Sequence, residues 1–178
     1  TGVTGASITG VSGTGATRTV TVNTGTGDGT IGLDMVNGTG VADLALNALG
    51  GVFPFIGEVF TIDKTAPTVT INQAGTQVDP TTTQPINFTV VFSETVTGFI
   101  ANDITLTGTA NVATAIKTIT GAGPTYNVAI TGVTGQGTVI ANIAANAVPD
   151  TAGNLNLAST STDNSVYYDA TPPTVTIT

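Results

Sequence analysis

Apolar and polar residues alternate in short runs along most of the chain. In the clearest run, INFTVVF at positions 86–92, the residues at every second position from Ile86 to Phe92 are large and apolar. A period of two is typical of a β-strand that buries one face. No segment sustains an apolar period of 3.6 residues, so we expect little helix. Within residues 63–168 the pattern predicts seven strands, at 67–72, 86–92, 103–108, 112–120, 125–133, 137–143 and 164–169.

Turn clusters separate these strands, among them TGAGPT at 120–125 and TGQGT at 134–138. Seven short alternating strands in about one hundred residues favour an all-β fold, an immunoglobulin-like Greek-key β-sandwich. The chain has no Cys and no Trp. The core of such a sandwich would therefore be aliphatic, with Phe and Tyr in place of a disulfide packed on a Trp.

One nine-residue stretch occurs twice in nearly the same form. DKTAPTVTI begins at Asp63 and DATPPTVTI begins at Asp169, 106 positions later. The segments that precede the two stretches also align, RTVTV (18–22) with YNVAI (126–130) and ADLALN (42–47) with PDTAGN (149–154). The alignment predicts sandwich repeats in tandem, cut as a window from a longer array. Residues 1–62 would be the C-terminal half of one repeat, 63–168 a complete repeat, and 169–178 the first strand of the next repeat or a donated strand.

The motifs DKTAPTVTI, INFTVVFSETVTGF, DITLTGTA, PDTAGN and DATPPTVTI together resemble the bacterial Ig-like repeats of large extracellular surface proteins and adhesins. The resemblance covers essentially the whole chain. It implies the sandwich fold and an extracellular or cell-surface location, and it is poorly specific for any ligand. The first repeat departs from the pattern, because ADLALNALGG stands where the second has PDTAGNLNLA.

The charge balance narrows the range of partners. The net charge is −8, from 11 acidic and 3 basic residues, the latter being Arg18, Lys64 and Lys117. Three cations cannot neutralise a run of phosphates, so we expect no nucleic-acid partner. No apolar run approaches the length of a membrane span, so we expect no membrane insertion. Excess carboxylate instead favours solubility and divalent cations.

An enzyme is not expected from this composition. The chain has no His for general base catalysis, no Cys nucleophile and no Ser in a nucleophile-elbow motif. A carboxylate pair for glycoside hydrolysis is conceivable, but only 5% of the residues are aromatic, and sugar clefts need aromatic walls. Runs such as GTGDG lack the Lys and the helix of a phosphate loop and are read as hairpin turns.

Acidic residues should gather at one pole of the complete repeat. If the strands run alternately up and down, five oxygen-bearing side chains meet at the end where the chain enters. Carboxylates that converge repel one another unless a cation lies among them, and Ca²⁺ accepts six to eight oxygen ligands in irregular geometry. The sequence therefore predicts a Ca²⁺ site at the inter-repeat junction, with no other cofactor. Its ligands would be Asp63, Glu94, Asp103, Asp150 and Asn154.

Other interpretations of the same residues remain open. Asp and Asn populate loops without any metal, so the carboxylates could simply be solvated. Lys117 could form an isopeptide crosslink to Asn or Asp catalysed by Glu94, although the sequence favours an exposed solubilising Lys. The Thr-x-Thr patterns could form an ice-facing array, but any outward-facing strand surface gives the same alternation.

The sequence thus favours an extracellular structural repeat that forms a stalk, fibre, filament or sheath at the bacterial cell surface. The alternative is an adhesin module that recognises a glycan or a surface protein through its pole loops. The expected partners are neighbouring repeats or copies of the chain itself, head to tail, with strand donation by TPPTVTIT (171–178) as one route. A half-sandwich would otherwise expose its inner face.

Overall fold

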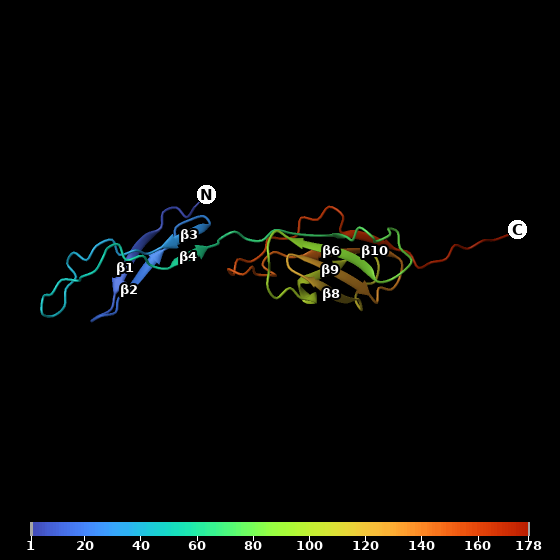
Figure 1. Cartoon of the computed structure of the whole chain (residues 1–178). Helices are drawn as coiled ribbons and strands as arrows, with labels where there is room; N and C mark the ends of the chain where they lie inside the picture. Colours follow the sequence, from blue (N-terminus) through green and yellow to red (C-terminus); the bar gives the residue numbers. More distant parts are fainter. Residues whose placement is uncertain (1, 178) are drawn as a thin grey trace. The chain divides into compact units, whose positions relative to one another are not determined.

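The chain divides into two compact units, Thr1–Thr65 and Ala66–Thr178, and the computed structural model describes residues 2–177 of it. Thr1 and Thr178, the outermost residues of the predicted segments 1–62 and 169–178, lie outside the described residues. Figure 1 shows the strands of each unit. Apart from one 3₁₀ turn, η1 (Ala101–Asp103), every regular element in residues 2–177 is a strand, which confirms the prediction of an all-β chain.

The second unit contains seven strands in two sheets, and every neighbouring pair is antiparallel. One sheet has the order β5-β6-β9-β8 and the other the order β11-β10-β7. These are the A-B-E-D and G-F-C orders of a constant-type immunoglobulin sandwich, so the predicted Ig-like fold is confirmed. The strands are β5 (Val69–Gln73), β6 (Ile86–Phe92), β7 (Ile104–Thr107), β8 (Ile116–Ala122), β9 (Thr125–Thr131), β10 (Gly137–Ile143) and β11 (Ser165–Tyr168).

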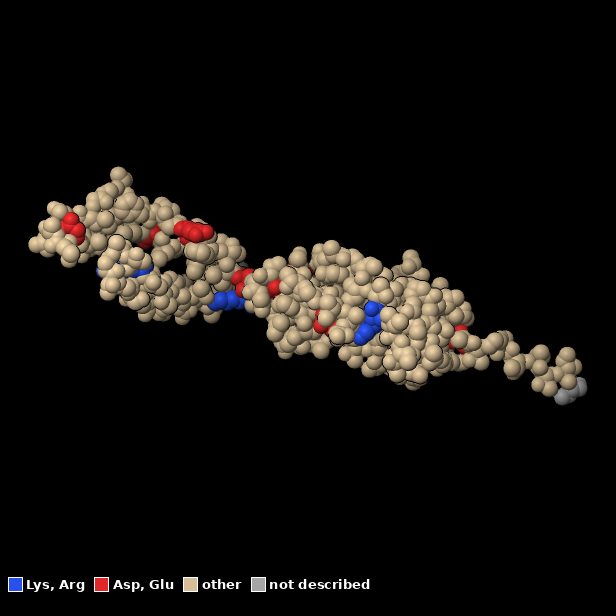
Figure 2. Space-filling view, turned by 90° about the horizontal axis from the view of Figure 1, so that it is seen from below, with Lys and Arg blue, Asp and Glu red and all other residues tan. Residues whose placement is uncertain are grey.

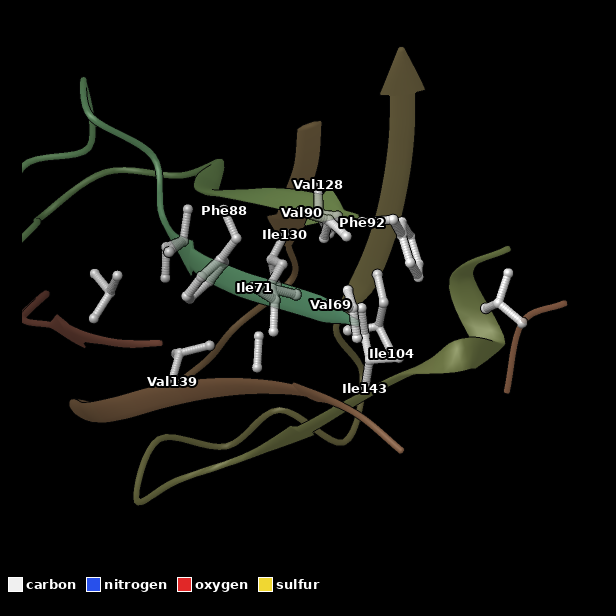
Figure 3. Close-up of a cluster of buried hydrophobic side chains, with 14 of the residues drawn as sticks. Val69, Ile71, Phe88, Val90, Phe92, Ile104, Val128, Ile130, Val139 and Ile143 are labelled. Atoms are coloured by element: carbon white, nitrogen blue, oxygen red, sulfur yellow. The ribbon is translucent and has the colours of Figure 1, made fainter. Parts of the chain in front are cut away.

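The core of the sandwich follows directly from the alternation in the sequence. In β6 every second side chain, from Ile86 to Phe92, is buried, and in β10 the same holds from Gly137 to Ile143. Figure 3 shows side chains of the two sheets pointing toward one another, with Phe88 and Ile71 on one side and Val139 on the other. Burial of these aliphatic and aromatic groups is the main force that holds the two sheets together.

One strand begins later than its pattern predicted. The prediction was 112–120, whereas β8 is Ile116–Ala122. The side chain of Asn111 accepts a hydrogen bond from the Ala113 N–H at 3.0 Å, and the Ala115 N–H donates to the Val112 carbonyl at 3.1 Å. The Ala113 and Ala115 N–H groups are therefore already bonded within a local turn. Residues 112–115 have the apolar–polar alternation of a strand but do not pair as one.

The outer edges of β5 and β11 are covered by other segments of the unit. Residues 157–163 follow β5, with backbone bonds from Leu157 to Pro67, from Thr160 to Val69 and from Gln73 to Asp163. On the other sheet Thr81 lies beside β11 and exchanges backbone bonds with Tyr167 and Asp169. Covered edges cannot pair with a foreign strand, which removes two aggregation sites.

The first unit contains two antiparallel pairs, β1 with β2 and β3 with β4. The bounds are β1 (Ser7–Ser12), β2 (Thr19–Asn23), β3 (Gly29–Gly32) and β4 (Val59–Ile62). No residue from 2 to 65 is buried. Strand propensity, hydrogen bonds and local contacts such as that between the Phe53 and Phe55 rings shape this unit, and its apolar side chains have no second layer to pack against.

Candidate functional site

The loop after β10 closes on itself through Asp150. One carboxylate oxygen of Asp150, Oδ1, accepts hydrogen bonds from the backbone N–H groups of Ala152, Gly153 and Asn154 at 2.8, 2.7 and 2.9 Å. The other oxygen accepts the Asn154 side-chain amide at 2.9 Å. Gly153 takes a φ of 96°, which only glycine adopts without strain. The motif PDTAGN is therefore a complete turn in its own right.

This turn is joined to the segment that follows β6. Val96 and Asp150 form an antiparallel bridge, and the Thr97 N–H donates to the Pro149 carbonyl at 2.9 Å. The bridge brings the loop that carries Glu94 beside the Asp150 turn. Carboxylate oxygens of Glu94 and Asp150 lie within 4.8 Å of one another, and Asp63, the third predicted carboxylate ligand, belongs to the first unit.

The two other predicted ligands have different positions. Asn154 donates its side-chain amide to the Asp150 carboxylate. Asp103 is not grouped with Glu94 and Asp150. Its Oδ2 accepts the Ile100 N–H at 2.8 Å and so closes the 3₁₀ turn η1 ahead of β7.

The Glu94 and Asp150 carboxylates lie at a separation that suits one hard cation. Ca²⁺–oxygen distances of about 2.3–2.6 Å place oxygens on opposite sides of the ion about 4.6–5.2 Å apart. Two oxygens within 4.8 Å of one another therefore fit on a single coordination sphere. The two carboxylates would supply two of the six to eight ligands that Ca²⁺ takes, and carbonyls or water would supply others.

Two opposing effects act on the pKa of the Asp150 carboxyl group. Burial alone would raise the pKa of Asp150, but the side-chain amide of Asn154 and the backbone N–H groups of Asn154, Gly153 and Ala152 hold it below its usual value. A carboxyl whose pKa is lower in the folded than in the unfolded state stabilises the fold above the unfolded pKa. That stabilisation is lost as the pH falls through the folded pKa.

We expect Asp150→Asn to weaken the acid sensitivity of the domain. The new amide can still accept the backbone N–H groups but brings its own NH₂ group against that of Asn154, and it has no proton to gain. The melting temperature of the variant should be lower than that of the parent at pH 7, and it should fall less between pH 7 and pH 3. Asp163→Asn, at an exposed loop position, is the control. An unchanged pH dependence in Asp150→Asn would contradict the assignment.

A second turn of the same kind occurs in the first unit. The Asp43 carboxylate accepts the backbone N–H groups of Ala45 and Asn47, both at 2.9 Å, and the Asn47 side-chain amide at 2.9 Å. These hydrogen bonds, led by the Asn47 side chain, lower the pKa of Asp43. Leu46 stands where the other turn has Gly153 and takes a φ of 67°, a conformation unfavourable for a residue with a Cβ. The altered sequence ADLALN thus keeps the turn, with some backbone strain.

Two important polar residues were missed by the sequence analysis. Asn156 is fully buried and makes four side-chain hydrogen bonds to backbone groups. Asp28 accepts the Thr65 hydroxyl and the Lys64 N–H, and the pKa of Asp28 is lowered by these bonds, the Thr65 bond first. Asp28 could have been found by its position in the turn TGDGTI. For Asn156 the only signal was one polar residue inside the alternating run NLNLA.

Lys117 lies on β8, an edge strand of the four-stranded sheet. From β8 its ammonium donates to the Ile104 carbonyl in β7 at 2.6 Å, across the open side between the two sheets. A charged side chain on an edge strand discourages pairing with another chain.

The surface is otherwise sparsely charged. Figure 2 shows few acidic and basic side chains on the face in view, with uncharged residues making up most of it. Within residues 2–177 we find no helix of sufficient length and hydropathy to span a bilayer.

Comparison with known proteins gives one match. A family model described as "Bacterial Ig-like domain" matches residues 63–168, which is more than half of the chain and includes Asp63, Glu94 and Asp150. No curated protein and no solved structure matches.

Proposed function

Because the chain belongs to the bacterial Ig-like domain family, we propose that it is an extracellular structural repeat of a stalk, fibre, filament or sheath at the bacterial cell surface. The family suggests a surface-protein repeat, and its domains are typically non-catalytic. The function then lies in length, stiffness and resistance to unfolding.

The main support is that the first unit repeats the pairing pattern of the second. The β3–β4 pair has Ile31 opposite Phe60, and the β10–β11 pair has Val139 opposite Val166. All four paired positions of β3–β4 match those of β10–β11 when β3 is shifted by 108 residues and β4 by 106. The same strand pairing at two places in one chain is what a series of Ig-like repeats would produce.

Microscopy of the native surface can test this proposal. Antibodies raised against residues 63–168 should label a thread or layer at many positions along its length. Labelling confined to a distal tip, with loss of attachment after antibody treatment, would contradict the structural role and support an adhesin. Labelling inside the cell would contradict both.

We further expect Ca²⁺ to bind at Glu94 and Asp150, with Asp63 as the third predicted carboxylate, and to stabilise the domain. At ten times its dissociation constant, one ion that binds only the folded state adds about 1.4 kcal/mol to the free energy of unfolding. For a domain of this size the melting temperature should rise by about 5 °C or more relative to the protein in a chelator.

Two matched variants make the test specific. Glu94→Gln should abolish most of the Ca²⁺-dependent rise, because it removes one grouped carboxylate. Asp103→Asn should retain the rise, because Asp103 is engaged in the η1 turn outside the group. The expectation fails if the melting temperature is the same in Ca²⁺ and in chelator, or if the two variants respond alike.

A further inference from the structure

The segment that follows β4 is held on the turn between β2 and β3 of the first unit. Asp28 lies in this turn, and its Oδ1 accepts the Lys64 N–H at 2.6 Å. The other carboxylate oxygen of Asp28 accepts the Thr65 hydroxyl. The Lys64 ammonium donates to the Gly25 carbonyl in the same turn. Residues 64 and 65 are therefore attached to the turn by three hydrogen bonds, each of which uses a charged group.

Strand pairing explains why Asp28 reaches this segment. Gly29 at the start of β3 pairs with Ile62 at the end of β4, so Asp28 comes next in the register, beside the residues that follow β4. The turn is itself supported, because Thr26 and Thr4 exchange two backbone hydrogen bonds, both of 2.9 Å. The pairing and this bridge together place the Asp28 carboxylate beside residues 64 and 65.

The equivalent turn of the second unit makes a different contact. Gln136 stands in the place of Asp28, next in the register beyond the β10–β11 pairing. The side-chain amide of Gln136 donates to the Tyr167 hydroxyl at 2.7 Å. Ala170 stands in the place of Lys64 and has no ammonium group. Both the carboxylate and the ammonium that attach residues 64 and 65 are thus replaced together in the second unit.

The two segments do share a local turn, but this turn does not explain the attachment. The Thr65 N–H donates to the Asp63 carboxylate at 3.0 Å, and the Thr171 N–H donates to the Asp169 carboxylate at the same distance. These bonds join residues two apart in sequence and leave the β2–β3 turn out. The attachment of residues 64 and 65 to that turn depends instead on Asp28.

We infer that Asp28 is a latch that holds residues 64–65 on the first unit and shields the Lys64–Thr65 peptide bond from trypsin-like proteases. A protease of this class must take the Lys side chain into its specificity pocket. The Lys64 ammonium is bonded to Gly25, and groups on both sides of the scissile bond are bonded to Asp28. Cleavage therefore requires the latch to open, and its rate follows the population of the open form.

The latch also limits the length of chain that is free between the two units. Within the second unit the Pro67 carbonyl accepts the Leu157 N–H at 2.8 Å. With the latch closed, Ala66 is the one residue between Thr65 and this attachment. Opening the latch releases residues 64 and 65 from the turn as well, and exposed connecting segments are the preferred sites of proteolytic nicking.

Trypsin digestion of the full chain tests the latch, because the sequence offers only three cleavage positions, after Arg18, Lys64 and Lys117. Asp28→Ala removes the acceptor and should raise the initial rate of cleavage after Lys64 by about threefold to tenfold. Gln136→Ala, at the equivalent position of the second unit, is the control and should leave that rate unchanged. Mass spectrometry of the fragments measures the rate at each position.

Cleavage after Arg18 separates opening of the latch from unfolding of the first unit. Arg18 lies immediately before β2 in the same unit, so it should be cleaved at the parent rate in Asp28→Ala if only the latch is lost. The inference is overturned if cleavage after Lys64 does not accelerate. It is also overturned if cleavage after Arg18 accelerates by the same factor.

Transfer of the latch to the second unit gives a test that does not depend on the stability of the first. Ala170→Lys creates a cleavage position after β11, and adding Gln136→Asp should install the latch there. Both chains carry Tyr167→Thr, which copies Thr61 and removes the competing phenol. Cleavage after position 170 should be slower by about threefold or more in the chain with Gln136→Asp. Equal rates in the two chains would overturn the inference, and no result bears on the proposed location at the cell surface.

Discussion

Replacing Phe88 by alanine is expected to lower the free energy of unfolding of the second unit by about 3–5 kcal/mol. Phe88 is fully buried and lies in β6, the strand between β5 and β9 in the four-stranded sheet. Removing its ring leaves a cavity in the layer between the sheets, which backbone hydrogen bonds on both sides of β6 prevent from collapsing. The melting temperature should fall by about 12 °C or more.

Chemical and thermal denaturation of the chain measure this effect. Val91→Ala is the matched control, because Val91 lies on the same strand but faces solvent and is exposed. It should cost less than about 1 kcal/mol. Equal losses for the two variants would show that the two faces of β6 are not distinguished by burial as described.

Asn156→Asp is expected to destabilise the domain by about 3 kcal/mol at neutral pH, although the two side chains have the same shape. The Asn156 amide NH₂ donates to the Ala144 and Leu157 carbonyls at 2.9 and 2.7 Å. Its oxygen accepts the N–H groups of Ala147 and Val148 at 2.9 and 2.7 Å. A carboxylate at this position keeps the second pair but turns an acceptor with negative charge toward two carbonyl oxygens.

The pH dependence of this variant distinguishes charge from packing. Protonation removes the charge and restores one donor, so the difference from the parent should shrink as the pH falls from 7 to 3. Denaturation at both pH values measures it. Asn102→Asp, at an exposed position, is the control and should change stability by less than about 0.5 kcal/mol. A pH-independent deficit in Asn156→Asp would contradict the hydrogen-bond assignment.

The strands of the complete domain could be predicted because each is a local pattern. β6 and β10 have the predicted bounds, since their buried side chains alternate without interruption. The start of β8 could not be predicted, because whether residues 112–115 pair or turn is decided by the side chain of Asn111. Alternation reports which face is buried, but it does not report which backbone groups a nearby side chain has already bonded.

The candidate site, like the fold, could be predicted only in part from the sequence. Counting strand directions was enough to suggest that Glu94 and Asp150 lie near one another, because loops at one end of a sandwich meet there. It could not separate Asp103, whose carboxylate is used by its own 3₁₀ turn. Nor could it find Asn156, whose importance comes mainly from three backbone groups of a neighbouring loop, at residues 144–148, rather than from its local sequence.

The coverage of β5 and β11 has a consequence for any protein that strings such domains together. Linked neighbours of nearly identical sequence meet at high effective concentration, and exchange of strands between them is the characteristic misfolding route of repetitive chains. Residues 157–163 and Thr81 already occupy the places where an intruding strand would bind. The outer edges of β5 and β11 in each folded domain are therefore already occupied. Neighbouring domains of similar sequence cannot exchange strands with it at those two edges.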